Sequence, residues 1–114
     1  MIREFIYFKI FDKSWTEMGL TGDELVELEK SIIKNPDVGK IIIGTGGVRK
    51  MRFALPDNDK GKSGGARVLY VDYVSLEKTV LLNAYPKGTK DSITDGEKQQ
   101  LKKIVEGLSK ELGK

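Results

Sequence analysis

The chain has 114 residues, 39% of them hydrophobic and 32% charged, with 20 Lys and Arg against 17 Asp and Glu. This length and composition predict one compact domain over residues 1–114 and exclude a disordered chain. The sequence contains neither cysteine nor histidine, which excludes disulfide frameworks, Cys/His zinc sites and catalytic triads that use imidazole.

No apolar run approaches the roughly 20 residues that span a bilayer, and the N-terminal residues lack the apolar core of a secretory signal. We therefore expect a cytosolic protein with no membrane partner. We also expect no metal or other cofactor, because no pair or cluster of carboxylates falls at a suitable spacing.

A strand is predicted over residues 2–11, where apolar side chains alternate on both faces. Trp15 follows and is expected to fix the next turn to the core. Thr21 and Glu24 then fit a capping box, which predicts a helix that ends at Asn35-Pro36. Its apolar stripe consists of Leu25, Leu28, Ile32 and Ile33.

The middle of the chain predicts three further strands. A brief apolar run, residues 40–43, leads into Gly44-Thr45-Gly46-Gly47 and a strand over residues 48–55. A polar loop over residues 56–65 precedes strands at residues 66–74 and 79–85, the latter so apolar that we expect it inside the sheet. The turn at residues 75–78 makes these two an antiparallel pair.

A second capping box, Thr94 to Glu97, opens the closing helix over residues 94–112. We therefore expect an α+β fold of order β-α-β-β-β-α, with a four-stranded, mainly antiparallel sheet and the helices packed on one side. Two helices cover only part of such a sheet, so part of its surface stays open.

Two glycine-rich stretches invite a nucleotide-binding interpretation, and both fail on spacing. Gly61-Lys62-Ser63 lacks the first glycine of a P-loop, because Pro56 stands there. Gly44-x-Gly46 is followed by Arg49 where the dinucleotide motif has its third glycine, and by a strand where it needs a helix. These glycines are better explained by tight turns.

Positive charge is concentrated in the middle of the chain. Residues 44–67 hold six basic and two acidic residues, a local charge of +4, so the rest of the chain carries −1. Lys50 and Arg52 are two apart on one strand face, and Arg67 lies on the neighbouring strand, so a hairpin register can bring all three together. One interpretation is a solvated face that protects a sheet edge. The other is a cationic pocket for a phosphodiester, in which arginines bind phosphate and a crowded lysine transfers protons.

Residues 44–54 (GTGGVRKMRFA) and 61–70 (GKSGGARVLY) together closely resemble the HigB-like branch of the RelE superfamily of bacterial type II toxins. The resemblance implies a RelE-like fold and a toxin that enters the ribosomal A site and cleaves mRNA there, without a metal, by attack of the ribose 2′-OH on the adjacent phosphate. It also implies a cognate antitoxin as partner, the ribosome and mRNA as targets, and DNA only indirectly, through a toxin–antitoxin complex on its operator.

The resemblance also assigns roles to residues. Lys50 is implied as base or electrostatic activator of the 2′-OH, and Arg52 and Arg67 as groups that stabilise the transition state. The sequence departs from RelE at two places. Gly88 stands where RelE has a further arginine, and the C-terminal catalytic tyrosine of RelE has no counterpart in this chain. We therefore expect Lys87 to serve as proton donor. The residues expected to bind RNA or the ribosome are Arg49, Lys60, Lys62 and Lys90.

Two alternatives share this sequence pattern. A ParE-like toxin would have the same fold and poison gyrase by binding it, and an RNA-binding module would bind without cleaving. The clustered cations argue against the gyrase alternative, because binding a protein does not require a phosphate site.

Overall fold

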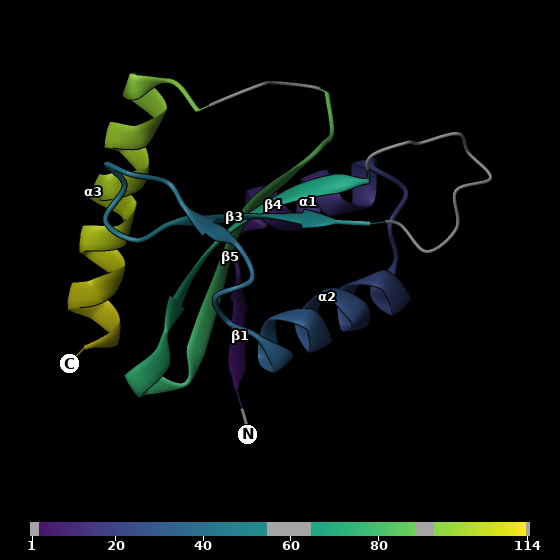
Figure 1. Cartoon of the computed structure of the whole chain (residues 1–114), viewed down its shortest axis with the longest axis horizontal. Helices are drawn as coiled ribbons and strands as arrows, with labels where there is room; N and C mark the ends of the chain where they lie inside the picture. The colour runs from purple at the N-terminus through teal and green to yellow at the C-terminus, as the bar shows by residue number, and fades with distance from the viewer. Residues whose placement is uncertain (1–2, 55–64, 89–92, 114) are drawn as a thin grey trace.

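A computed structural model describes residues 3–54, 65–88 and 93–113. A five-stranded sheet of order β1-β5-β4-β3-β2 lies at its centre (Figure 1). The α+β class expected from the sequence is confirmed. In chain order the elements are β1 (Glu4–Tyr7), α1 (Lys9–Glu17), α2 (Gly22–Lys34), β2 (Lys40–Ile41), β3 (Arg49–Phe53), β4 (Ala66–Tyr73), a 3-10 turn (Val74–Leu76), β5 (Lys78–Pro86) and α3 (Asp95–Leu112).

The sheet is mainly antiparallel, as expected, with β1 alone parallel to its neighbour β5. Strands β3, β4 and β5 form the expected antiparallel meander, and β5 lies inside the sheet. The strand count differs from the expected four because the short run Lys40–Ile41 pairs with β3 and forms the edge strand β2.

The expected first strand, residues 2–11, is wrong in its second half, because the chain turns into α1 at Lys9. Phe11 and Trp15 are four residues apart and therefore share one helix face. Both are buried there, and their rings stack with centroids 5.3 Å apart. The alternation of apolar residues is compatible with a strand. The chain forms a helix instead, because a helix buries both aromatic rings on one face.

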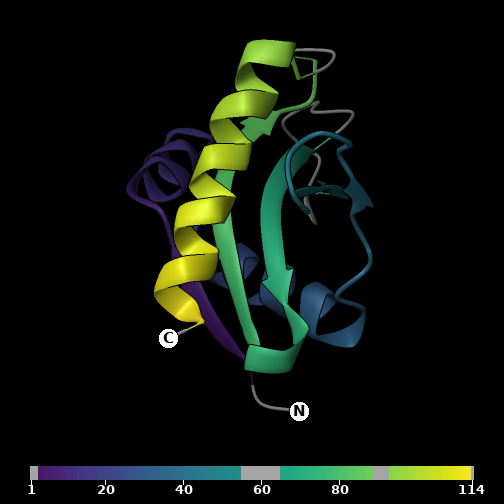
Figure 2. The ribbon, with the colours of Figure 1, turned by 90° about the vertical axis from the view of Figure 1, so that its left-hand side faces the viewer.

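The helices lie on both faces of the sheet, which corrects the expectation that they pack on one side (Figure 2). Strand β4 shows why: Val68 and Tyr70 point into the core formed with α1 and α2, whereas Leu69 and Val71 point into a second core beneath α3. A strand whose successive residues are all apolar is buried on both faces.

Both predicted helix starts are confirmed. The side chain of Thr21 accepts a hydrogen bond from the Asp23 amide, and the Glu24 carboxylate accepts one from the Thr21 amide. Thr94 and Glu97 form the same reciprocal pair at the start of α3. Helix α2 ends at Lys34, directly before Asn35-Pro36.

The Gly44-Thr45-Gly46-Gly47 segment is a turn that joins β2 to β3. All three glycines have positive φ, at 91°, 80° and 122°, a region that L residues avoid. The fully buried Thr45 holds the turn closed, because its hydroxyl donates to the Ile42 carbonyl (2.7 Å) and accepts from the Val48 amide (3.0 Å). The structural explanation of these glycines is therefore confirmed.

Tyr70 ties the connector before β2 to the centre of the sheet. Its buried hydroxyl accepts a hydrogen bond from the Gly39 amide (2.9 Å) and donates one to the Pro36 carbonyl (2.8 Å). Gly39 lies so close that an added Cβ would stand 2.9 Å from the Tyr70 ring. Burial raises the pKa of the Tyr70 phenol above its ordinary value.

Replacing Tyr70 by phenylalanine is expected to lower the free energy of unfolding by about 1–3 kcal/mol, because the Gly39 amide and the Pro36 carbonyl both lose a buried partner. Urea denaturation measures this change. Tyr73→Phe is the matched control, since among the described residues the Tyr73 hydroxyl makes a single long hydrogen bond, 3.4 Å, to the exposed Ser109 hydroxyl, and its expected effect is below about 0.5 kcal/mol. Equal losses in the two variants would contradict the anchoring role of Tyr70.

Candidate active site

Strand pairing brings four basic side chains to one face of the sheet. Arg52 on β3 lies directly opposite Arg67 on β4, and Lys50 on β3 lies directly opposite Lys40 on β2. Side chains at such positions have their Cβ atoms about 4.5–5.5 Å apart. The expected register, which gathers Lys50, Arg52 and Arg67, is therefore confirmed, whereas their catalytic role remains a prediction.

These cations line a groove of about 620 Å³. Arg52 is exposed, and Lys50 and Arg67 are half-buried. Like charges placed directly opposite each other on a sheet destabilise it, and no carboxylate is among the described residues that line this groove. The lining residues are Val38, Lys40, Lys50, Met51, Arg52 and Arg67. We refer to it as the cationic groove.

Protection of a sheet edge does not explain this group. Arg67 lies on β4, which is flanked on both sides by β3 and β5, so it has no edge to protect. The cations lie on the face that α3 covers further along the same strands, because Arg67, Leu69 and Val71 alternate on one side of β4. The groove is thus the part of this face that α3 leaves open.

Arg49, which we expected to bind RNA, points to the other face of β3. Its guanidinium donates to the Gly39 carbonyl (2.7 Å) and pairs with the Asp37 carboxylate (3.1 Å). Arg49 therefore supports the same connector that Tyr70 holds, and the structure does not bring it to the groove. Strand alternation alone already separates Arg49 from Lys50 and Arg52.

Lys87 directly follows the last residue of β5. Its side chain is exposed, and its amide donates to the Gly65 carbonyl (3.0 Å) just before β4. This places Lys87 two residues beyond the Arg67–Tyr85 pair rather than among the groove residues. Lys60, Lys62 and Lys90, which we expected to bind RNA or the ribosome, lie outside the described residues.

Two residues near the groove were missed from the sequence. In the sequence Lys40 only precedes an apolar run, but in the structure β2 pairs it with Lys50. Tyr85 lies directly opposite Arg67 on β5 and is half-buried. Its position depends on a β-bulge. Leu69 pairs with Asn83, but the next residue, Tyr70, pairs with Leu81, so β5 has one extra residue at this point.

Residues 3–54, 65–88 and 93–113 hold neither a metal-binding cluster nor a membrane-spanning helix. No group of three or more Asp, Glu, His or Cys side chains that could hold a metal ion occurs among them. In the same part of the chain, none of the helices is long and apolar enough to cross a membrane.

Comparison with protein families gives a match over nearly the whole chain. The family described as the RelE toxin of the RelE/RelB toxin–antitoxin system matches residues 7–112. The matched range contains every element from α1 to α3, together with Lys40, Lys50, Arg52 and Arg67. The chain therefore belongs to the RelE toxin family and is a toxin of the toxin–antitoxin type.

Proposed function

We propose that this toxin is a ribosome-dependent mRNA endonuclease of the HigB-like branch, which cleaves translated mRNA in the A site. The cross-strand pair Arg52–Arg67 carries the proposal, because it puts two arginines directly opposite each other in the groove that Lys50 also lines. Guanidinium groups stay charged and match the geometry of phosphate oxygens. A pair of them in an open groove suits an RNA backbone.

In the proposed reaction the ribose 2′-oxygen attacks the adjacent phosphorus, and the bond to the 5′-oxygen breaks. The products are a 2′,3′-cyclic phosphate and a free 5′-OH. Lys50 accepts the 2′-OH proton or activates that hydroxyl electrostatically. Arg52 and Arg67 stabilise the negative charge that develops on the phosphate oxygens.

The leaving 5′-oxygen needs a proton, and Tyr85 is better positioned than Lys87 to donate it. Tyr85 stands directly opposite Arg67, so a phosphate bound by Arg67 would lie on the side of the sheet where Tyr85 stands. Lys87 is exposed and lies beyond the end of β5. We therefore assign the donor role to Tyr85 in place of the Lys87 expected from the sequence.

Tyr85→Phe is expected to lower the cleavage rate by about 10²-fold, in the range typical for loss of a general acid, whereas Lys87→Ala changes it less than about threefold. Single-turnover cleavage of mRNA on programmed ribosomes measures both rates. The phenylalanine keeps the ring and its packing, so it removes only the hydroxyl. A large loss in Lys87→Ala with an active Tyr85→Phe would reverse the assignment.

Lys40 is expected to bind a phosphate in the groove without taking part in proton transfer. Lys40→Ala should weaken RNA binding and reduce the slope of log K against log salt by about 0.7–0.9, the contribution of one phosphate contact. Binding to a short single-stranded RNA between about 50 and 200 mM salt gives this slope. Lys103→Ala, an exposed cation on α3, is the matched control, and an equal decrease of the slope there would contradict a specific contact.

Membership of the family implies an antitoxin protein as partner. We further propose the ribosome and its mRNA as the targets, which places the toxin in the cytosol, and contact with operator DNA only through the complex with the antitoxin. An antitoxin that covers the groove would have to present acidic groups to its four cations.

The proposed function is tested by translating an mRNA in vitro with the protein and mapping new 5′ ends. We expect ends at codon-linked positions that are absent without ribosomes and absent in Lys50→Ala and Arg67→Ala. The same variants should not arrest growth when expressed. Intact mRNA with altered DNA supercoiling would favour a ParE-like gyrase poison, and RNA binding without cleavage would favour a binding module; either result overturns the proposal.

A further inference from the structure

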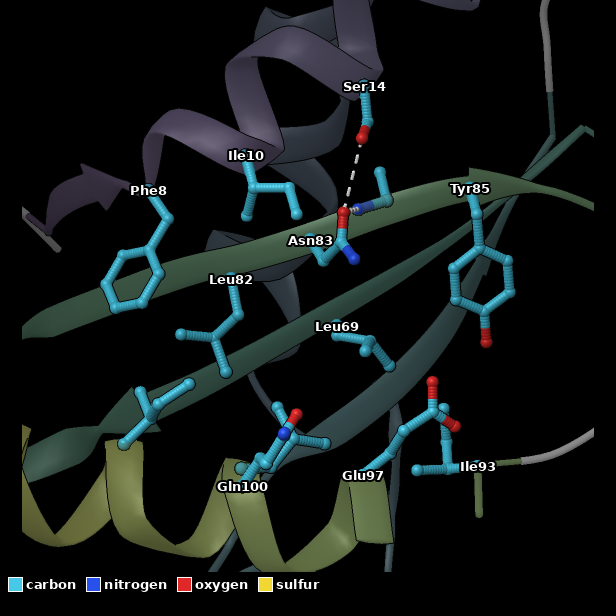
Figure 3. Close-up of a pocket in the computed structure, with 13 residues that line it drawn as sticks. Phe8, Ile10, Ser14, Leu69, Leu82, Asn83, Tyr85, Ile93, Glu97 and Gln100 are labelled. Atoms are coloured by element: carbon cyan, nitrogen blue, oxygen red, sulfur yellow. Dashed lines mark hydrogen bonds between the residues drawn. The ribbon is translucent and has the colours of Figure 1, made fainter.

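A second cavity, of about 360 Å³, lies between α1, β5 and α3 on the same face of the sheet as the cationic groove (Figure 3). Its walls are mainly apolar and include Phe8, Leu69 and Leu82, with Ile10 and Ile104 at its rim, exposed by 54% and 36%. Apolar walls with a few fixed polar groups are typical of sites for small molecules. We call it the α1–α3 pocket.

Asn83 supplies one fixed polar group of this pocket, which Ser14, Tyr85, Glu97 and Gln100 also line. Its Oδ1 accepts hydrogen bonds from the Ala84 amide (2.8 Å) and the Ser14 hydroxyl (3.3 Å). The Ala84 amide is a donor and needs an acceptor, so the carboxamide oxygen of Asn83 must face it. The orientation of the Asn83 side chain, with Oδ1 toward Ala84 and Nδ2 away from it, follows from this. Figure 3 shows Nδ2 directed away from Ser14, toward the space that Leu69, Leu82 and Gln100 surround.

The two N–H groups of this Nδ2 are donors set in an apolar cavity. None of the residues that the structure describes accepts a hydrogen bond from them. Shielding such a group from water without a hydrogen-bond partner is unfavourable. Because Oδ1 already accepts hydrogen bonds from Ala84 in the bulge and from Ser14 on α1, Asn83 presents only its N–H donors to the cavity. A ligand that fills the cavity therefore needs a hydrogen-bond acceptor.

The α1–α3 pocket adjoins the cationic groove through two pairs of neighbours. Tyr85 lines the pocket and stands opposite Arg67, and Leu69 lines it and stands opposite Lys50. A nucleotide strand whose phosphate lies between the arginines therefore has a cavity within reach of its neighbouring base. The flat faces of a base suit apolar walls, and its ring nitrogens and carbonyls are acceptors.

We propose that the α1–α3 pocket binds an unstacked base of the RNA strand that the cationic groove holds, with Asn83 donating a hydrogen bond to it. The inference rests on the proposed function, in that the groove binds RNA phosphate. An apolar side chain of a partner protein fits less well, because it would leave the Asn83 donors without an acceptor.

Titration of the full chain with the four nucleosides, followed by NMR, tests this directly. Nucleosides carry no phosphate, so their binding does not depend on the groove or on cleavage. We expect at least one nucleoside to shift the Asn83 side-chain amide and the methyl groups of Leu69, Leu82 and Ile104 at millimolar concentration. Ribose alone should shift none of them.

Asn83→Asp keeps the acceptor for Ala84 and Ser14 and replaces the two donors by an oxygen, so we expect nucleoside binding to weaken about five- to tenfold. Gln99→Glu, the same chemical change on an exposed position of α3, should leave binding unchanged. If Asn83→Asp does not fold, Ile10→Ala and Ile104→Ala, which shorten exposed rim side chains, should still weaken it.

The outcomes separate the two proposals. Nucleoside binding in the pocket by a protein that does not cleave RNA would support a base site and overturn the proposed nuclease. Arg67-dependent cleavage without nucleoside shifts, and with an unchanged pattern of cleaved codons in Asn83→Asp, would overturn the base site alone. Shifts confined to Arg52 and Arg67 would overturn it as well.

Discussion

Arg67→Ala is expected to lower the rate of ribosome-dependent mRNA cleavage by about 10²–10³-fold, the effect of removing one preorganised group that stabilises transition-state charge. Arg67 lies between two strands with Arg52 opposite it on one side and Tyr85 on the other, so no other described cation can take its position. Folding should be retained, because removing one of two opposed guanidinium groups relieves repulsion.

Two variants sharpen this prediction. Arg67→Lys keeps the charge and loses the planar pair of donors, so partial activity is expected. Arg49→Ala removes an arginine from the same sheet on the opposite face, and its cleavage per folded molecule should equal that of the unsubstituted protein. An Arg49→Ala defect as large as that of Arg67→Ala would show that the effects do not arise from the groove.

Asp72→Asn is expected to lower the free energy of unfolding by about 3–5 kcal/mol, because it leaves the Arg3 guanidinium buried beside a neutral group. The Asp72 carboxylate is 2.6 Å from an Arg3 nitrogen and 2.6 Å from the Thr79 hydroxyl. The side chains of Arg3 and Asp72 are 0% and 4% exposed. This pair fastens the start of β1 to the β4–β5 hairpin. Urea denaturation measures the change.

The exposed pair between Lys78 and Glu4 provides the control, since it joins β1 to the other strand of the β4–β5 hairpin at 2.7 Å but the Glu4 side chain is 61% exposed. Glu4→Gln should change stability by less than about 1 kcal/mol. The double variant Arg3→Met with Asp72→Leu should recover most of the loss, because removing both charges leaves none buried alone. A double variant as unstable as Asp72→Asn would contradict this explanation.

The parts of the fold that were predictable are those encoded by adjacent residues. The capping boxes at Thr21 and Thr94 fixed both helix starts, because the side chain and the amide it caps lie within three residues. The apolar character of β4 and β5 and the glycines before β3 were enough to give the meander. Alternation along β3 then separated Lys50 and Arg52 from Met51 and Phe53.

The parts that were not predictable depend on partners far along the chain. Helix α1 forms because Phe11 and Trp15 find a core made by β3, β4 and β5. Lys40 joins the groove only because two residues of β2 pair with β3. The orientation of Asn83 and Tyr85 depends on a bulge whose position follows from the β4–β5 register and leaves no mark in local sequence.

The chemistry of the cut ends tests the central claim most directly. An mRNA translated in the presence of the toxin should yield fragments with 2′,3′-cyclic phosphate on one side and 5′-OH on the other, at codon-linked positions. These ends should disappear when ribosomes are omitted or when Lys50 is replaced by alanine. Ends that carry a 5′-phosphate, or mRNA that stays intact while growth stops, would contradict a groove that cleaves RNA by attack of the 2′-OH.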